Sequence, residues 1–230
     1  MIFVFDLDDT IYEEKSFYVN GLRAVINFFS KKLNLSKRKI FLKLTEDTKR
    51  NSRKKILDRF LIAFNIFSKA NLILAINIFR KNNLRLKPYG DAKKIFTNYK
   101  EIHKYIVTDG NKHVQKNKIE MLGIKKFFKK IFITRNYSIK YEKPSLYCFK
   151  KILKLEKSNW NSLVYIADNP LKDFVNLNRK GSITIRIQRG NYKHIQPKKK
   201  IFDAKFKFRS FNKSFYDLLD SYEHKVTNRN

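Results

Sequence analysis

The chain opens with a short apolar segment that stops abruptly at acidic residues. Residues 2–5 read Ile-Phe-Val-Phe, and Asp6, Asp8 and Asp9 follow directly after them. A run that is apolar at every position is typical of a strand buried in a parallel sheet, and open sheets of this kind bind ligands at the carboxyl ends of their strands. This segment therefore predicts a parallel α/β sheet with an acidic site at one edge.

The strand pattern is interrupted and then resumes. Between residues 13 and 87, apolar residues recur at helical spacing, which predicts a helical bundle. Strand-like runs return at 104–107, 132–134, 163–167, 183–187 and 204–208, with helical segments between them. We therefore predict an α/β fold: a Rossmann-like parallel sheet core of residues 1–12 and 88–230, with an all-helical cap domain inserted at 13–87. An insertion after the first strand is expected to lie over the carboxyl edge of the sheet.

Composition narrows the class of protein. The chain carries 52 Lys and Arg against 20 Asp and Glu, a net charge of +32, which favours anionic partners, although the abundance of Lys, Asn, Ile and Phe also fits the bias of an AT-rich genome. A single cysteine, Cys148, excludes a disulfide within the chain. The most apolar stretch, 56–79, is interrupted by charged residues, and the amino terminus lacks the pattern of a signal peptide. We expect a soluble, cytoplasmic protein without membrane contact.

Two motifs suit chemistry on phosphate groups. Asp6 and Asp8 leave the first strand together, so that both carboxylates can converge on one Mg²⁺ ion and one substrate, one attacking phosphorus while the other transfers a proton. Thr108, Asp109 and Gly110 follow another apolar strand, where the Thr hydroxyl and the N–H groups of the turn can bind phosphate oxygens. Taken singly, the first motif also fits a solvated acidic loop, and the second fits an ordinary turn.

Two further motifs complete a set. Lys143, before Pro144, could neutralise the acidic cluster and a phosphoryl group, although a lone lysine carries little information in so basic a chain. Asp168 ends a third apolar strand, and Asp173 lies in the first turns of the next helix, where it could equally complement the helix dipole. Because the carboxyl ends of parallel strands meet at one edge, the motifs together predict a single site.

These four motifs, in this order, resemble those of the haloacid dehalogenase-like (HAD) superfamily. The resemblance rests on residues 6–10 (DLDDT), on Thr108, on Lys143 with Pro144, and on residues 168–173 with the preceding strand, and it extends from residue 3 to about 187. Residues 116–123 and 143–145 also look like the phosphatase branch of the superfamily. The position of the helical block resembles the family's cap after the first motif.

The resemblance implies a role for each motif residue. Asp6 would be the nucleophile that forms an aspartyl-phosphate, and Asp8 the general acid and then the general base. The phosphoryl group would be bound by Thr108 and Lys143, beside the turn at Asp109 and Gly110. Mg²⁺ would be held by the carboxylate of Asp6, the backbone carbonyl of Asp8 and the carboxylate of Asp168, while Asp173 would support the metal site.

The function expected is therefore a Mg²⁺-dependent phosphatase acting on a small phosphorylated metabolite. One alternative is a phosphomutase on the same scaffold. Another is a basic protein that binds polyanions or nucleic acid, with vestigial or end-phosphatase activity, suggested by basic groups at 37–39, 49–55 and 80–87. The complete catalytic set and the lack of a nucleic-acid motif favour the phosphatase. Substrate contacts from the cap side are expected at Tyr12, Glu13, Lys15, Asn20 and Arg23.

Overall fold

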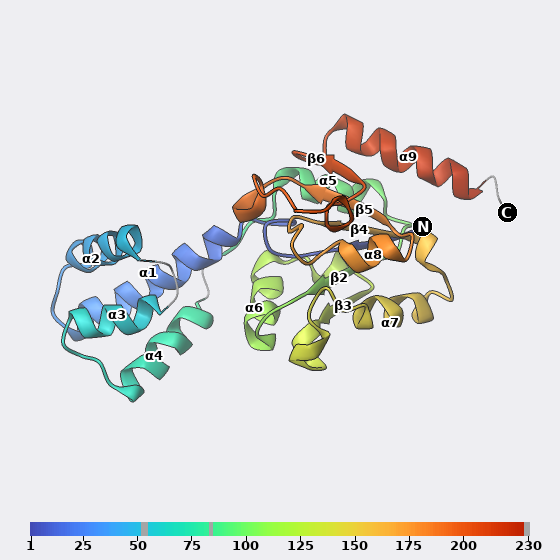
Figure 1. Ribbon diagram of the computed structural model, residues 1–230. Helices are drawn as coiled ribbons and strands as arrows, with labels where there is room; N and C mark the ends of the chain where they lie inside the picture. Colours follow the sequence, from blue (N-terminus) through green and yellow to red (C-terminus); the bar gives the residue numbers. More distant parts are fainter. Residues whose placement is uncertain (52–54, 83–84, 228–230) are drawn as a thin grey trace. The chain divides into compact units, whose positions relative to one another are not determined.

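The computed structural model describes residues 1–51, 55–82 and 85–227. The chain divides into two compact units: a core unit of Met1–Glu14 with Arg85–Asn230, and a helical unit of Lys15–Leu84 (Figure 1). Parts of the basic groups at 49–55 and 80–87 lie outside the described residues.

A parallel sheet forms the centre of the core unit. In the described part of the chain it has six strands in the order β3-β2-β1-β4-β5-β6, and every neighbouring pair is parallel. The strands are β1 (Ile2–Phe5), β2 (Lys104–Thr108), β3 (Lys130–Ile133), β4 (Leu163–Ala167), β5 (Ile183–Ile187) and β6 (Phe206–Phe208). The predicted α/β fold with a Rossmann-like parallel sheet is therefore confirmed.

The register of the sheet decides which residues share its carboxyl edge. Phe5, at the end of β1, pairs with Ile106 on one side and with Ile166 on the other. The residues that follow these positions therefore leave the sheet at one edge, and they include Asp6 and Asp168. This is the edge at which parallel sheets bind ligands.

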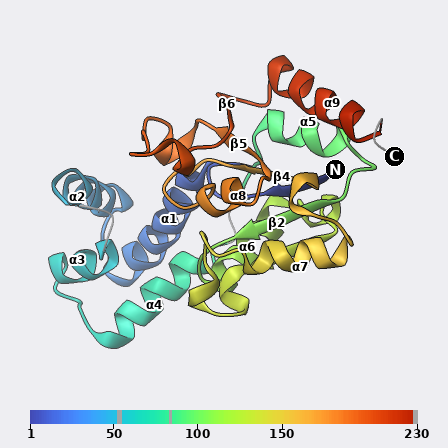
Figure 2. The same ribbon diagram turned by 45° about the vertical axis from the view of Figure 1, so that its right-hand side comes forward.

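Alternate residues of the central strand pack against different layers of helices. Ile2 and Val4 join a buried cluster with residues of α7 (Tyr147–Leu155) and α8 (Val175–Arg179). Phe3 and Phe5 instead contact Tyr99 and Phe96 edge to face, at α5 (Gly90–Asn98). Helix α9 (Lys213–Thr227) lies beside α5, as Figure 2 also shows. Burial on both faces explains why the strand is apolar throughout.

The remaining helix of the core unit, α6 (Lys112–Leu122), follows β2 directly. The side chain of Asn111 caps it by accepting hydrogen bonds from the backbone N–H groups of His113 and Val114. Gly123 ends it with a φ of +64°, a left-handed conformation that favours glycine. Among the described residues, no helix has the length and apolar character needed to cross a membrane.

The helical unit contains α1 (Glu14–Lys32), which begins at its border, and then α2 (Lys37–Arg50), α3 (Ile56–Ala63) and α4 (Lys69–Arg80). The apolar stretch at 56–79 is two helices, because Asn65 adopts a φ of 54° and Ser68 caps α4 by accepting from the backbone N–H of Asn71. The hydrophobic core of the helical unit includes Val25, Phe29 and Phe60.

Candidate active site

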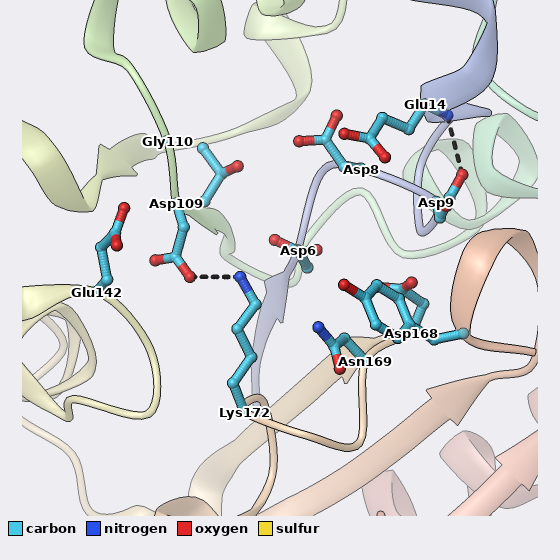
Figure 3. Close-up of a pocket in the computed structure, with 12 residues that line it drawn as sticks. Asp6, Asp8, Asp9, Glu14, Asp109, Gly110, Glu142, Asp168, Asn169 and Lys172 are labelled. Atoms are coloured by element: carbon cyan, nitrogen blue, oxygen red, sulfur yellow. Dashed lines mark hydrogen bonds and ion pairs between the residues drawn. The ribbon is translucent and has the colours of Figure 1, made fainter. Parts of the chain in front are cut away.

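A pocket of about 270 Å³ opens at the carboxyl edge of the sheet (Figure 3). Its lining belongs to the core unit and consists mainly of acidic and polar residues: Asp6, Asp8, Asp9, Glu14, Thr108, Asp109, Gly110, Glu142, Asp168, Asn169, Lys172 and Tyr192. The pocket therefore brings together residues from the first, second and fourth motifs, and it lies where the sequence places the site.

Lys143, the third motif, is buried and bridges two of the predicted carboxylates. Its Nζ is 2.7 Å from Asp6 Oδ1 and 2.8 Å from Asp173 Oδ1, and its side chain is only 1% exposed. The same ammonium donates to the hydroxyl of Tyr165 at 3.0 Å. Burial raises the pKa of the Asp6 carboxyl to about 7, because Lys143 offsets only part of the desolvation and Asp173 adds like-charge repulsion.

Asp173 orients its neighbours through both carboxylate oxygens. Oδ1 accepts from Lys143 and from the Tyr165 hydroxyl, and Oδ2 accepts from the backbone N–H of Asn169 at 3.1 Å. Asp173 is itself buried, so these contacts replace solvation. They fix both the lysine and the turn that follows Asp168.

The carboxylates of Asp6, Asp168 and Asp173 form a buried cluster whose ligand atoms all lie within 4.8 Å of one another. Among the described residues, no hydrogen bond or ion pair engages the Asp168 carboxylate. Burial raises its pKa well above the usual value, and repulsion from Asp6 and Asp173 adds to the effect. A clustered set of three hard carboxylate oxygens fits a divalent cation, because the Lys143 ammonium is bonded to two of these carboxylates and not to the third.

Asp8 is held by three side chains. Its Oδ1 accepts from the hydroxyl of Tyr12 at 2.5 Å and from Nζ of Lys118 at 2.7 Å, while Oδ2 accepts from Nε2 of Gln115 at 3.0 Å. Burial would raise the pKa of Asp8, but Lys118, Tyr12 and Gln115 together lower it. Tyr12 was expected to contact substrate, yet it is fully buried and its hydroxyl serves Asp8.

The turn of the second motif contacts α6 on one side and two lysines on the other. Thr108 accepts a hydrogen bond from Gln115 at 2.5 Å, and Gly110 adopts a φ of +116°, a conformation that suits glycine. The carboxylate of Asp109 accepts from the backbone N–H of Lys143 and, at 2.6 Å, from the ammonium of Lys172. The side chain of Asp109 therefore positions both lysines, which leaves backbone groups of the turn for an anion.

The loop after β5 is joined to the first motif through Asp9. Asp9, with a φ of 51°, accepts from the backbone N–H groups of Glu14 and Asn191, each at 2.9 Å. A Cβ at Gly190 would lie 2.0 Å from Cγ of Asp9, so only glycine allows this approach. Asp9 thereby ties the start of α1 to the loop that carries Tyr192 into the pocket.

Sequence reasoning missed several residues that surround the predicted ones, namely Gln115, Lys118, Tyr165 and Lys172. A signal existed for two of them. Gln115 and Lys118 are one helical turn apart at buried positions of α6, and buried polar residues on a packed face call for a partner. Lys172 stands among 52 basic residues, and no pattern distinguishes it.

Comparison with known proteins decides the family. Residues 3–184 match the family described as haloacid dehalogenase-like hydrolase. The chain belongs to this family. The predicted relationship to HAD hydrolases is therefore confirmed, and two curated relatives place it with phosphatases.

These HAD relatives are both named glyceraldehyde 3-phosphate phosphatase. The protein of Methanopyrus kandleri is 27% identical over 205 residues, which cover 85% of this chain and 87% of the relative. That of Methanocaldococcus jannaschii is 28% identical over 202 residues, covering 84% and 87%. They support the predicted enzyme class, a HAD-like phosphomonoester hydrolase.

Solved HAD structures share the fold. The HAD-hydrolase YfnB from Bacillus subtilis, bound to magnesium, superimposes with a TM-score of 0.64 at 17% identity, covering 95% of this chain and 97% of that one. A 2-haloacid dehalogenase from Pseudomonas syringae gives 0.65 at 15% identity, covering 96% and 100%. At such identity the likeness concerns the fold alone.

Proposed function

We propose that this HAD hydrolase cleaves small phosphate monoesters through an aspartyl-phosphate on Asp6, with Mg²⁺ as its cofactor. The observation that carries the proposal is the buried Asp6 carboxylate at the end of the central strand, paired with Lys143 and clustered with Asp168. The names of the two curated relatives make glyceraldehyde 3-phosphate the first substrate to test.

The donor set suits the cofactor. Mg²⁺ would be held by the carboxylates of Asp6 and Asp168 and by the backbone carbonyl of Asp8. Both oxygens of Asp173 already accept hydrogen bonds within the protein, which favours a supporting role for it. When bound, the ion supplies positive charge that stabilises the phosphoryl oxygens as negative charge develops on them.

The side chains divide the two steps between them. In the first, Asp6 attacks phosphorus, the ester P–O bond breaks, and Asp8 gives its proton to the departing oxygen. In the second, Asp8 takes a proton from water, whose oxygen displaces Asp6 and releases inorganic phosphate. Throughout, the hydroxyl of Thr108 and the backbone N–H groups at Asp109 and Gly110 hold the phosphoryl oxygens, and the positive charge of Lys143 stabilises the phosphoryl group.

We assign the helical insertion at residues 13–87 as the cap domain that excludes bulk water during the reaction. Its place in the chain, between β1 and α5, supports this assignment. The cytoplasmic location stays a prediction.

The test is phosphate release from p-nitrophenyl phosphate and from glyceraldehyde 3-phosphate with Mg²⁺. Wild type is compared with Asp6→Asn, with a sample in EDTA, and with Asp217→Asn, an exposed carboxylate on α9. Activity is expected in wild type and Asp217→Asn, and it should vanish in the other two. Retention of activity by Asp6→Asn would contradict the proposed nucleophile, and activity in EDTA would contradict the metal requirement.

A further inference from the structure

The Asp8 carboxylate is surrounded by a clamp of three side chains: Tyr12, Gln115 and Lys118. Lys118 and Tyr12 donate to Oδ1, and Gln115 donates to Oδ2. The side chain of Lys118 is only 6% exposed, although lysines rarely lie buried without a specific partner. A buried ammonium directed at one carboxylate indicates a dedicated contact.

The residues of the clamp are held in place by the secondary structure around them. Gln115 and Lys118 lie one turn apart on α6, whose first turn is capped by Asn111. Tyr12 is held by backbone bridges to Asp8 and to Pro88, and the Lys118 ammonium lies 5.9 Å from the centre of its ring. These contacts restrict the movement of the donors, which together hold the Asp8 carboxylate in the orientation observed.

The clamp also leaves one carboxylate oxygen available. From the residues that the structure describes, Oδ1 receives two donors and Oδ2 receives one, so Oδ2 keeps a lone pair. Asp8 also lines the pocket (Figure 3). Gln115 donates at the same time to the hydroxyl of Thr108, at 2.5 Å. The amide of Gln115 thus fixes the distance between the Asp8 carboxylate and the hydroxyl of Thr108.

We propose that Lys118, Gln115 and Tyr12 are positioning residues that aim Oδ2 of Asp8 at the leaving-group oxygen of the substrate. The inference rests on the proposed function and deepens it. During the first step the proton on Oδ2 moves to the ester oxygen as the P–O bond breaks, and the clamp then stabilises the carboxylate that results. Tyr12, Gln115 and Lys118 are buried and do not line the pocket, so they act through Asp8.

The test compares an alkyl phosphate, glyceraldehyde 3-phosphate, with an aryl phosphate, p-nitrophenyl phosphate. The value of kcat/KM reports the steps up to departure of the leaving group. An alkoxide needs the proton from Asp8, whereas p-nitrophenolate leaves without it. A misdirected Asp8 therefore slows the alkyl ester selectively, and a general loss of structure slows both esters alike.

Lys118→Met is expected to lower kcat/KM about 10- to 100-fold for the alkyl ester and less than about 3-fold for the aryl ester. The loss should stay below the roughly 10²- to 10⁴-fold contribution of a general acid, because Asp8 itself is retained. Lys118→Arg should restore part of the loss, since it keeps a cation at the site. The matched control is Lys116→Met on the same helix, where the lysine side chain is 73% exposed. It should change neither value.

Tyr12→Phe, which removes a single hydroxyl, provides a second variant if Lys118→Met does not fold by circular dichroism. It should shift the ratio of the two kcat/KM values in the same direction. Equal losses for both esters, or no loss, in a folded clamp variant would overturn the positioning role while leaving the phosphatase intact. A wild type that releases phosphate from neither ester would refute the proposed function and the clamp's role with it.

Discussion

Replacement of Asp168 by Asn tests whether repulsion among the clustered carboxylates destabilises the protein when no metal is bound. The carboxylates of Asp6, Asp168 and Asp173 lie within 4.8 Å of one another, and Lys143 is bonded to Asp6 and Asp173 but not to Asp168. Two like charges 4.8 Å apart repel by about 3.5 kcal/mol at an effective dielectric constant of 20. Asp168 is repelled by Asp6, Asp173 and Asp9 and is attracted by Lys143, so the repulsion at this carboxylate exceeds the attraction.

The variant should therefore be more stable than wild type when metal is absent. Partial protonation of the cluster relieves some of the repulsion, so we expect a gain of about 1–2 kcal/mol, or roughly 2–8 °C in Tm for a chain of this size. In wild type, Mg²⁺ should raise Tm by binding the folded state. The variant lacks one ligand and should gain little from Mg²⁺, and its phosphatase activity should be lost.

The assay is thermal unfolding in EDTA and in excess Mg²⁺. Asp217→Asn is the control, because this carboxylate is 58% exposed and its ion-pair partner, Lys213, is 90% exposed. Such a surface pair is worth at most about 1 kcal/mol. The control should match wild type under both conditions. A variant that is less stable than wild type in EDTA, or that shows the full Mg²⁺ shift, would refute the reasoning.

Three further predictions follow from the core unit. Burial would raise the pKa of Glu156, but hydrogen bonds from Tyr105, His103 and Lys129 lower it to about 2. Its stabilising contribution should therefore be complete above about pH 4.5 and fade as pH falls toward 2. Solvent screening of the partly exposed partners of Glu156 limits this contribution to about 1 kcal/mol. Urea unfolding of wild type and Glu156→Gln at several pH values measures it. Burial raises the pKa of Cys148 to about 11, so the thiol should react with Ellman's reagent at pH 8 only after denaturation. Lys172→Met should weaken inhibition by inorganic phosphate about tenfold, in a steady-state assay, because a charged hydrogen-bond donor leaves the pocket.

The strands and their ends could be predicted from the sequence because a buried strand is recognised by the composition of a few consecutive residues. Residues 2–5 are apolar at every position, and a strand covered on both faces needs that composition. Parallel pairing brings the carboxyl ends of β1, β2 and β4 to one edge, so the sequence alone groups Asp6, Thr108 and Asp168.

The boundaries of helices and the hydrogen-bond partners of side chains were harder to predict. The apolar pattern at 56–79 does not show where one helix stops, because Asn65 and Ser68 end and restart the helix through backbone conformation and capping. The hydroxyl of Tyr12 made it a candidate for contact with substrate, but the residue is buried and its hydroxyl donates to Asp8. In both cases the deciding interaction lies outside the hydrophobic pattern.

By itself, then, the sequence determined the class of fold, and it predicted the edge that carries the site and the residues proposed to do the chemistry, because periodicity and strand ends are properties of short segments. Only the tertiary structure decided which lysines among 52 serve that site. Lys143 meets Asp6 across 137 positions and Lys118 meets Asp8 across 110. Such contacts depend on how helices and turns pack around the sheet edge, and side chains so far apart in the chain meet only after that packing has formed.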